Sequence, residues 1–402
     1  MGMHEAPKSE RCHIGFFGLR NAGKSSLVNA VTGQDLSIVS NVKGTTTDSV
    51  SKAMELLPLG PVVIIDTPGL DDEGELGLAR VDRALRELRK CDVVVLVSDA
   101  ARSLLPLEQE FVDKLKAESR PLIVARNKAD MLPEGARVED LTGLPEGAAQ
   151  CVVSATADQG IFELKELIAR VGLQADTAAP KTILQDLAGP GDVVVMVVPI
   201  DSSAPKGRLI LPQQLVLREL LDMHANALIC QPEELADTLG KLVDPPRLVV
   251  TDSQAFHQVD PLVPQNVPLT SFSILMARYK GELAPYMAGA REIATLQDGD
   301  RVLIAEGCTH HRQCEDIGTV KMPRWIRDFS GAQPEFEFVS GNEFPADLSG
   351  YRLIVHCGGC MLNEREMHFR MASAQAAGIP IVNYGIAIAH MNGILTRSVQ
   401  GL

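Results

Sequence analysis

Three cysteines near the C-terminus have the spacing of a metal or cluster site. One string, Cys-Thr-His, spans residues 308–310, and a second, His-Cys-Gly-Gly-Cys, spans residues 356–360. A C-x-x-C turn lets two thiolates face one metal, and its two glycines allow the backbone to approach closely. The three thiolates of Cys308, Cys357 and Cys360 predict an iron–sulfur cluster in which one iron keeps a weak or exchangeable fourth ligand.

Zinc is the competing metal for these residues. Cys308, His310, Cys357 and Cys360 would form a tetrahedral zinc site by ligand count, and the spacing alone favours neither metal. Two unrelated thiol pairs are the third interpretation. This third interpretation is weakened because each string follows an apolar run with the pattern of a buried strand. In open α/β sheets, ligands gather outside the carboxyl ends of the strands.

A second set of residues, near the N-terminus, predicts a phosphate site. The string Gly-Leu-Arg-Asn-Ala-Gly-Lys-Ser at 18–25 fits the pattern G-x-x-x-x-G-K-[ST], and it follows a strand-like run and opens a helix-like run. Glycines let backbone N–H groups approach phosphates. Lys24 can reach the β- and γ-phosphates, and Ser25 can ligate Mg²⁺. The N-terminal end of the helix adds a favourable dipole for an anion.

Four further strings extend this site to a metal shell and a base. Asp66 ends a strand-like run in Asp-Thr-Pro-Gly and can hold the Mg²⁺ shell, and Gly69 can sense the γ-phosphate through its N–H. Thr46, in the string at 44–48, is placed for Mg²⁺. Asp130 ends Asn-Lys-Ala-Asp and can accept hydrogen bonds from the guanine N1–H and 2-amino group. Adenine does not offer both donors, so the predicted base is guanine, supported by backbone contacts at 154–156.

These strings make the following site predictions. The expected catalytic residues are Lys24, Thr46, Asp66 and Gly69. The expected Mg²⁺ ligands are Ser25, Thr46 and Asp66. The expected nucleotide-binding residues are Gly18, Asn21, Ala22, Gly23, Lys24, Ser25, Ser26, Asn127, Lys128, Asp130, Ser154 and Ala155.

The apolar pattern predicts the strands and helices that hold these residues. Residues 11–172 alternate helix-like stretches with five near-continuous aliphatic runs, typical of a parallel sheet covered on both faces. These runs are at 12–17, 62–65, 92–97, 121–125 and 151–153. A linker rich in small residues follows at 174–180.

Two further α/β segments follow the linker. The first contains strand-like runs and no catalytic signature, which is typical of a dimerisation or docking unit; its strands are expected at 192–199, 227–230 and 247–251, with helices at 212–224 and 232–242. The second carries the cysteine strings; its strands are expected near 301–306, 335–339, 352–356 and 379–383, with helices near 283–296, 315–329, 363–377 and 385–396.

The predicted fold class is α/β, with a doubly wound P-loop GTPase sheet followed by two smaller α/β parallel-sheet domains. The predicted domains span 1–173, 181–265 and 266–402.

Composition excludes several classes of function. A chain of 402 residues is too long for one hydrophobic core, so two or three domains are expected. The net charge of −14 disfavours nucleic acid as the main partner, because phosphate binding needs basic surface. No apolar run reaches the length of a membrane span, and the N-terminal residues lack a signal-peptide core. We therefore expect a cytoplasmic protein whose cysteines are thiols or metal ligands.

The nucleotide motifs resemble those of Era/TrmE-like GTPases. Asn21 directly precedes Ala-Gly-Lys, and in that group an asparagine here is associated with a potassium ion near the phosphates. The resemblance therefore implies stimulation by K⁺. Leu70 follows Gly69 where many GTPases carry a water-positioning glutamine, which implies slow intrinsic hydrolysis.

Taken together, the motifs resemble the [FeFe]-hydrogenase maturation GTPase family, HydF. That family joins an Era-like GTPase domain to a dimerisation domain and a cluster domain, and its signature is C-x-H followed, after a spacer, by H-C-x-x-C. The resemblance implies that Cys308, Cys357 and Cys360 hold a [4Fe–4S] cluster. The fourth iron position stays open among His310, His356, Glu315, Cys314 and water.

The resemblance also implies a function. The chain would be a dimeric GTPase scaffold on which a diiron precursor is assembled and then transferred to apo-hydrogenase, with radical-SAM maturases as partners. The alternative is a ribosome- or tRNA-associated Era/TrmE-like GTPase with a structural zinc site. A redox enzyme using the cluster for electron transfer is a third possibility, for which there is no flavin or nicotinamide signature.

Overall fold

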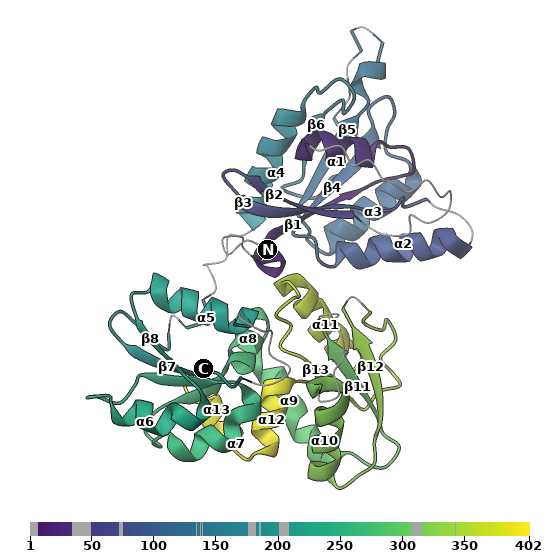
Figure 1. Ribbon diagram of the computed structural model, residues 1–402. Coiled ribbons are helices and arrows are strands. Elements are labelled where there is room, and N and C mark those ends of the chain that lie inside the picture. Colours follow the sequence, from purple (N-terminus) through teal and green to yellow (C-terminus); the bar gives the residue numbers. More distant parts are fainter. Residues whose placement is uncertain are drawn as a thin grey trace. The chain divides into compact units, whose positions relative to one another are not determined.

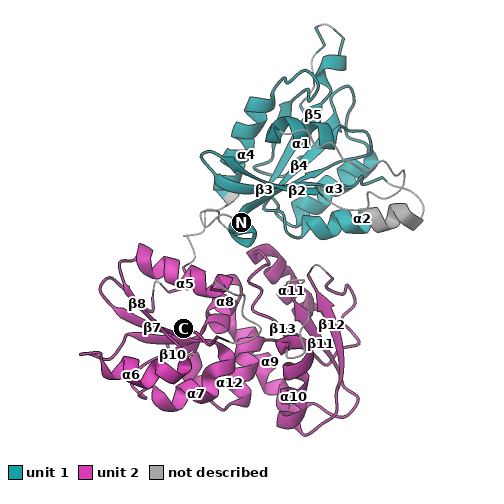
Figure 2. Cartoon of the chain, viewed as in Figure 1, with its two compact units in different colours: residues 1–180 teal, residues 181–402 magenta. Residues whose placement is uncertain are grey.

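The computed structural model describes residues 7–33, 50–71, 75–133, 135–136, 138, 140–175, 182–184, 186–200, 209–307, 316–341 and 343–402. The chain forms two compact units, Met1–Pro180 and Lys181–Leu402 (Figure 2). Each unit is built around parallel β-sheets, so the predicted α/β class is confirmed.

A six-stranded sheet with the order β2-β3-β1-β4-β5-β6 forms the centre of the first unit. Five of its strands run parallel: β1 (Cys12–Phe17), β3 (Gly60–Asp66), β4 (Val93–Asp99), β5 (Leu122–Asn127) and β6 (Ala149–Val152). The edge strand β2 (Val50–Leu56) pairs antiparallel with β3 and was not expected. Its side chains alternate between exposed and half-buried, so it has no continuous apolar run.

Helices cover both faces of this sheet (Figure 1). Residues alternate along β4: Val93, Val95 and Val97 join a core with α1 and α4, and Val94 and Leu96 join a second core with α2 and α3. The helices span α1 (Lys24–Thr32), α2 (Glu75–Leu88), α3 (Pro106–Ala117) and α4 (Ile161–Ala175). The two cores show the doubly wound arrangement that the aliphatic runs predicted.

The second unit begins with a four-stranded parallel sheet of order β10-β9-β7-β8. Its strands are β7 (Val193–Val197), β8 (Asn226–Cys230), β9 (Leu248–Thr251) and β10 (Leu269–Ser271), and its helices are α5 (Leu211–Asp222), α6 (Leu235–Gly240), α7 (Phe256–Val259) and α8 (Phe272–Lys280). Because β10 pairs with β9, this sheet continues past residue 265, where the sequence-based boundary was placed.

A second four-stranded parallel sheet, of order β12-β11-β13-β14, completes this unit. Its strands are β11 (Arg301–Glu306), β12 (Glu335–Ser340), β13 (Leu353–His356) and β14 (Ile381–Asn383). The helices are α9 (Leu283–Glu292), α10 (Met322–Ser330), α11 (Glu364–Ala376), α12 (Tyr384–Met391) and α13 (Leu395–Ser398), with a π-helical turn at Ile317–Lys321. The four strands expected here from the sequence are confirmed.

One hydrophobic core extends across both sheets of the second unit. It contains Val195 and Val249 from the first sheet and Val302 and Val355 from the second. The last helix, α13, contacts β10, and Arg397 on it donates hydrogen bonds to the carbonyl oxygens of residues in the 260–267 segment. The end of the chain thus packs back against the sheet that begins the unit (Figure 1).

A helix that crosses a membrane must be both long and apolar. None of the helices in the described part of the chain is long and apolar enough to cross a membrane.

Candidate functional site

The loop after β1 has the backbone of a phosphate cradle. Gly18 and Gly23 both have positive φ, +151° and +90°. A Cβ at Gly18 would lie 2.3 Å from the carbonyl oxygen of Val97, and one at Gly23 would lie 2.3 Å from Nδ2 of Asn127. Both positions therefore require glycine, which is what the spacing of the motif predicted.

The ammonium of Lys24 lies against the same loop. Lys24 is buried, and its Nζ donates to the carbonyl oxygens of Gly18 at 3.1 Å and Leu19 at 2.8 Å. These contacts hold the positive charge at the loop whose backbone would surround the phosphates.

Ser25 and Asp66 offer oxygen ligands for a cation. Ser25 Oγ donates to Asp66 Oδ2 at 2.6 Å, and Asp66 Oδ1 is buried with no hydrogen-bond partner among the described residues. Burial raises the pKa of this carboxyl group, an effect that the hydroxyl of Ser25 and the charge of Lys24 partly offset. A hydroxyl and a buried carboxylate with an unused oxygen fit Mg²⁺, which prefers such ligands. The third expected ligand, Thr46, lies outside the described residues.

The base-binding strings are joined to the phosphate loop by hydrogen bonds. Nδ2 of Asn127 donates to the carbonyl oxygen of Ala22 at 3.0 Å, and the N–H of Ala155 donates to Oδ1 of Asn127 at 3.1 Å. Ser154 Oγ donates to Asp130 at 2.5 Å and lowers the pKa of that carboxyl group. Asp130 is thereby kept ionised, as an acceptor for the two guanine donors must be.

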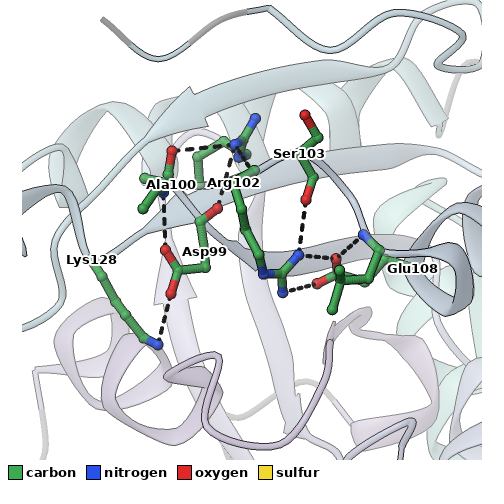
Figure 3. A network of polar contacts seen from close by, with 9 residues as sticks. Asp99, Ala100, Arg102, Ser103, Glu108 and Lys128 are labelled. Atoms are coloured by element: carbon green, nitrogen blue, oxygen red, sulfur yellow. Dashed lines mark hydrogen bonds and ion pairs between the residues drawn. The ribbon is translucent and has the colours of Figure 1, made fainter. Parts of the chain in front are cut away.

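Lys128 has a partner that the sequence did not indicate. Its Nζ contacts Asp99 at the end of β4 at 3.0 Å, and the register of β4 and β5 places Asp99 beside Asn127. Nearby, Arg102 forms a bidentate ion pair with the buried Glu108, in which Nη1 donates to Oε2 at 2.6 Å and Nη2 donates to Oε1 at 3.1 Å (Figure 3). This network fixes the segment between β4 and α3 next to the base-binding string.

A cavity of about 490 Å³ connects the two halves of this site. Nine of its lining residues are among the expected binding residues, and Thr156 belongs to the string at 154–156 that was expected to support the base. The lining residues are Asn21, Gly23, Lys24, Ser25, Ser26, Asn127, Lys128, Asp130, Met131, Ala155 and Thr156. Only Met131 is an addition, and it directly follows Asp130, the last residue of its motif.

Gly307, which precedes the first cysteine string, and Cys357 of the second string lie at one edge of the last sheet. β11 and β13 are adjacent and parallel, so Gly307 and Cys357 follow neighbouring carboxyl ends. The N–H of Gly307 donates to Sγ of Cys357 at 3.0 Å, and the N–H of Gly359 approaches the same sulfur at 3.4 Å. Cys308 is bonded to Gly307 but lies outside the described residues, as do His310, Cys314 and Glu315.

Burial acts on the thiols of Cys357 and Cys360, the two cysteines of these strings that the structure describes. Burial raises the pKa of Cys357 to about 11 and also raises the pKa of Cys360. The metal-free thiols therefore hold their protons at neutral pH, and metal binding would release them. Within the described part of the chain, no group of three or more His, Cys, Asp or Glu side chains is placed to hold a metal ion.

His356 already has a partner at each ring nitrogen. Nδ1 lies 2.7 Å from the carbonyl oxygen of Cys357, and Nε2 lies 3.0 Å from Nη1 of Arg370. Because a guanidinium only donates, Nε2 accepts and Nδ1 carries the proton. Burial, and then the charge of Arg370, lower the pKa of His356 to about 3. To bind iron, this imidazole would first have to give up one of these hydrogen bonds.

Models of known protein families match residues in each of the three segments expected from the sequence. Residues 13–128 match the family described as 50S ribosome-binding GTPase. Residues 183–281 match the hydrogen maturase F dimerization domain, and residues 284–401 match the hydrogen maturase F tetramerization domain. The first unit therefore contains a GTPase domain, and the second unit matches oligomerisation domains over most of its length.

Individual relatives match only part of the chain. The tRNA modification GTPase MnmE of Marinomonas sp. is 33% identical over 42% of this chain and 37% of its own length. The GTPase Der of Kosmotoga olearia is 26% identical over 60% of this chain and 58% of its own length. The chain thus spans less than two thirds of either relative. The structure of Aquifex aeolicus Era bound to GDP.AlF4- is 20% identical, covers 54% of this chain and 91% of that chain, and has a TM-score of 0.34.

Proposed function

The chain belongs to the hydrogen maturase F family, and on this premise we propose that it is a GTP-hydrolysing scaffold for [FeFe]-hydrogenase maturation. Its cysteines would hold a [4Fe–4S] cluster with one exchangeable iron position. A diiron precursor would be assembled on this scaffold and then transferred to apo-hydrogenase. Radical-SAM maturases would supply the precursor's ligands, and the protein would act in the cytoplasm.

The closeness of the end of β11 to Cys357 is the observation that supports this proposal. The hydrogen bond from Gly307 to the sulfur of Cys357 joins the end of β11, where Cys308 follows, to the C-x-x-C turn after β13. Backbone N–H groups aimed at a sulfur stabilise its thiolate form, which is the form that binds iron. When bound, the cluster supplies an iron that accepts a further ligand. Cys308, Cys357 and Cys360 would leave that position to a weaker ligand such as His310 or Glu315.

In the first unit, the residues around the cavity support GTP binding and hydrolysis. Lys24 would neutralise the β- and γ-phosphates, Ser25 and Asp66 would hold Mg²⁺, and Asp130 would select guanine. Bound Mg²⁺ stabilises the charge that develops on the phosphates. Asn21 has a left-handed backbone, φ +61°, at the place associated with K⁺. Leu70 offers no group to position water, so hydrolysis would be slow until a partner orders the site.

A homodimer is the proposed assembly. The dimerization-domain match covers the first sheet of the second unit, in which β8 is an edge strand with exposed Leu228 and Ile229. An edge strand with unpaired backbone groups and exposed apolar side chains is a template for pairing with a second copy.

Electron paramagnetic resonance tests the cluster proposal. Protein reconstituted anaerobically with iron and sulfide, then reduced with dithionite, should show a [4Fe–4S]⁺ signal that shifts when imidazole is added. Cys357→Ser should lose the signal, whereas Cys91→Ser, which changes a buried thiol of the first unit, should keep it. Stoichiometric zinc without iron after anaerobic purification would overturn the proposal. That result would favour the alternative, a tRNA- or ribosome-associated GTPase with structural zinc, which the names of the relatives suggest.

Titration with labelled GTP and ATP tests the nucleotide site. Asp130→Ala should weaken GTP binding and reduce the preference for GTP over ATP, because the paired acceptor for the guanine donors is removed. Asp113→Ala, on the exposed side of α3, should bind GTP as the wild type does. Unaltered GTP affinity in Asp130→Ala would show that the base site lies elsewhere.

A further inference from the structure

Lys280, the last residue of α8, is a buried cation beside the cysteine turn. Only 2% of its surface is exposed. Its Nζ donates to the carbonyl oxygen of Leu362 at 2.7 Å and to that of Cys360 at 3.3 Å. The ammonium thus lies on the backbone that carries one of the proposed cluster thiolates. A buried ammonium is costly unless its N–H groups are hydrogen-bonded, and these two contacts meet part of that requirement.

The sequence of α8 explains why Lys280 points to this turn. The helix begins after β10 with Ser271 as its N-cap, whose side chain accepts from the N–H of Ile274. It ends at Gly281, where a Cβ would lie 2.8 Å from Sδ of Met371 on α11. This close approach brings the C-terminal end of α8 against α11, and Lys280 donates hydrogen bonds to the turn that precedes α11.

A second residue of α8 approaches the other end of the turn. Ser273 Oγ donates to Oδ1 of Asn383 at 3.2 Å, and Nδ2 of Asn383 donates to the carbonyl oxygen of Cys357 at 3.4 Å. A Cβ at Gly358 would lie 3.4 Å from Ser273 Oγ. The helix therefore contacts the turn at both cysteines, through Asn383 at Cys357 and through Lys280 at Cys360.

We propose that Lys280 is a positioning residue of the cluster site, contributed by the segment that matches the dimerization domain. It would hold the backbone at Cys360 in place and supply a positive charge next to the cluster. This inference rests on the proposed function, because it requires a cluster at Cys357 and Cys360. A [4Fe–4S] cluster held by three thiolates is anionic, and more so after reduction. A fixed positive charge beside it would therefore favour the reduced state.

The position of α8 gives this role a further consequence. Lys280 lies within the match to the dimerization domain, residues 183–281, whereas both cysteines lie within the match to the tetramerization domain, residues 284–401. The cluster site would thus take residues from two domains. A partner that displaces α8 would change both the geometry at Cys360 and the charge near the cluster.

Two substitutions separate the charge of Lys280 from its hydrogen bonds. Lys280→Gln keeps a donor and removes the charge, and Lys280→Met removes both. Lys241→Met is the matched control, because Lys241 lies in the same domain, is 72% exposed and pairs only at the surface with Asp237. Each protein, as the full chain, is reconstituted with iron and sulfide, and the midpoint potential of its cluster is measured by redox titration.

The expected result is a lower midpoint potential in both Lys280 variants. A tenfold shift of the redox equilibrium toward the oxidised cluster corresponds to 59 mV for a one-electron couple. In the metal-free proteins, Lys280→Met should also bind Co²⁺ at least tenfold more weakly than the control, because the turn has lost its anchor. Circular dichroism verifies folding, and if Lys280→Met does not fold, Lys280→Gln decides the question.

Two different failures can be told apart. If the wild-type protein assembles a cluster but the Lys280 variants have the same midpoint potential and Co²⁺ affinity as Lys241→Met, only the role of Lys280 is overturned. A wild-type protein that assembles no cluster would overturn the proposed function itself.

Discussion

Arg370 is the largest side chain that the described part of the structure buries completely. Its guanidinium contacts Glu366 at 2.9 Å and Nε2 of His356 at 3.0 Å, and it lies over the ring of Phe344 at 5.1 Å. All of these groups lie on the last sheet or on the segments packed against it. Arg370 therefore connects α11 to the end of β13, where the cysteine turn begins.

Loss of this guanidinium should strongly destabilise the second unit. Arg370→Met leaves the carboxylate of Glu366 buried without its partner, which typically costs about 3–5 kcal/mol of unfolding free energy. Urea denaturation measures the effect. Arg218→Met, in an exposed pair with Asp222, should leave the midpoint unchanged. Equal midpoints for the two variants would show that the buried pair does not stabilise the fold.

His356 should make the metal-free protein sensitive to mild acid. Its pKa is lowered from 6.5 to about 3 by burial and by Arg370, so the folded chain keeps it neutral while the unfolded chain protonates it. Its contribution to stability is complete above pH 6.5. It then falls by about 1.4 kcal/mol for each pH unit below 6.5, until the folded pKa is reached.

Urea denaturation at pH 7.5, 6.5 and 5.5 measures this dependence. His356→Asn should lose less stability over this range than the wild type, and the exposed His257→Asn should lose as much as the wild type. A His356→Asn protein with the wild-type slope would contradict the assignment.

Short strings predicted the residues of the nucleotide site because their spacing encodes the chemistry directly. Asp66 begins its motif and Asp130 ends its own. The structure places Asp66 beside Ser25, its expected partner in the Mg²⁺ shell, and Asp130 beside Ser154. Asp99 and Lys280 could not be found in this way. Asp99 is 29 residues from Lys128, and Lys280 is 80 residues from Cys360. Strand pairing brings Asp99 to Lys128, and helix packing brings Lys280 to Cys360. No local sequence pattern indicates either contact.

At the scale of elements, continuous apolar runs predicted the strands that both faces of a sheet bury. Such runs did not identify β2, whose residues alternate between exposed and half-buried because the strand lies at an edge of the sheet. They also did not identify β10, because its three residues are too few to form a run. The sequence-based boundary at 265 followed from missing β10. The division into three domains stays a prediction, since contacts divide the chain into two compact units.

The approach of α9 to β14 depends on one glycine. A Cβ at Gly289 would lie 2.1 Å from the carbonyl oxygen of Ile381, so a side chain there must push the helix away from the strand. Gly289→Ala should lower the unfolding free energy by about 1–3 kcal/mol. The measurement is the midpoint of urea or thermal unfolding.

Gly240 provides the matched control for this substitution. It ends α6, has no positive φ, and a Cβ there would meet no atom within 4 Å. Gly240→Ala should be neutral or stabilise by about 0.5–1 kcal/mol, because alanine restricts the unfolded chain more than glycine does. If both substitutions had the same effect, the close packing of α9 on β14 would not limit stability.

At the scale of the whole molecule, the continuous core makes the second unit one folding unit. Core residues from both of its sheets form a single cluster. Residues 182–402 should therefore unfold in one transition, whereas residues 284–402 alone should not fold, because the shared core loses every residue that lies before position 284. Residues 7–175 should fold alone and bind GTP, since their two cores lie within the first unit.

The single tryptophan provides a specific probe for this test. Trp325 lies in α10 and packs against the shared core, so its fluorescence reports the second unit alone. Coincident urea transitions by fluorescence and circular dichroism for residues 182–402 are expected. A cooperative transition for residues 284–402 would show that the last sheet folds independently.

The return of α13 to the first sheet of the second unit also bears on biosynthesis. A ribosome releases the N-terminal residues first, so the GTPase domain can fold while the remainder of the chain is still being made. The segment at 260–267 receives the guanidinium of Arg397 more than a hundred residues later. The first sheet of the second unit therefore completes its packing only after Arg397 has been synthesised, so the second unit folds later in synthesis than the GTPase domain.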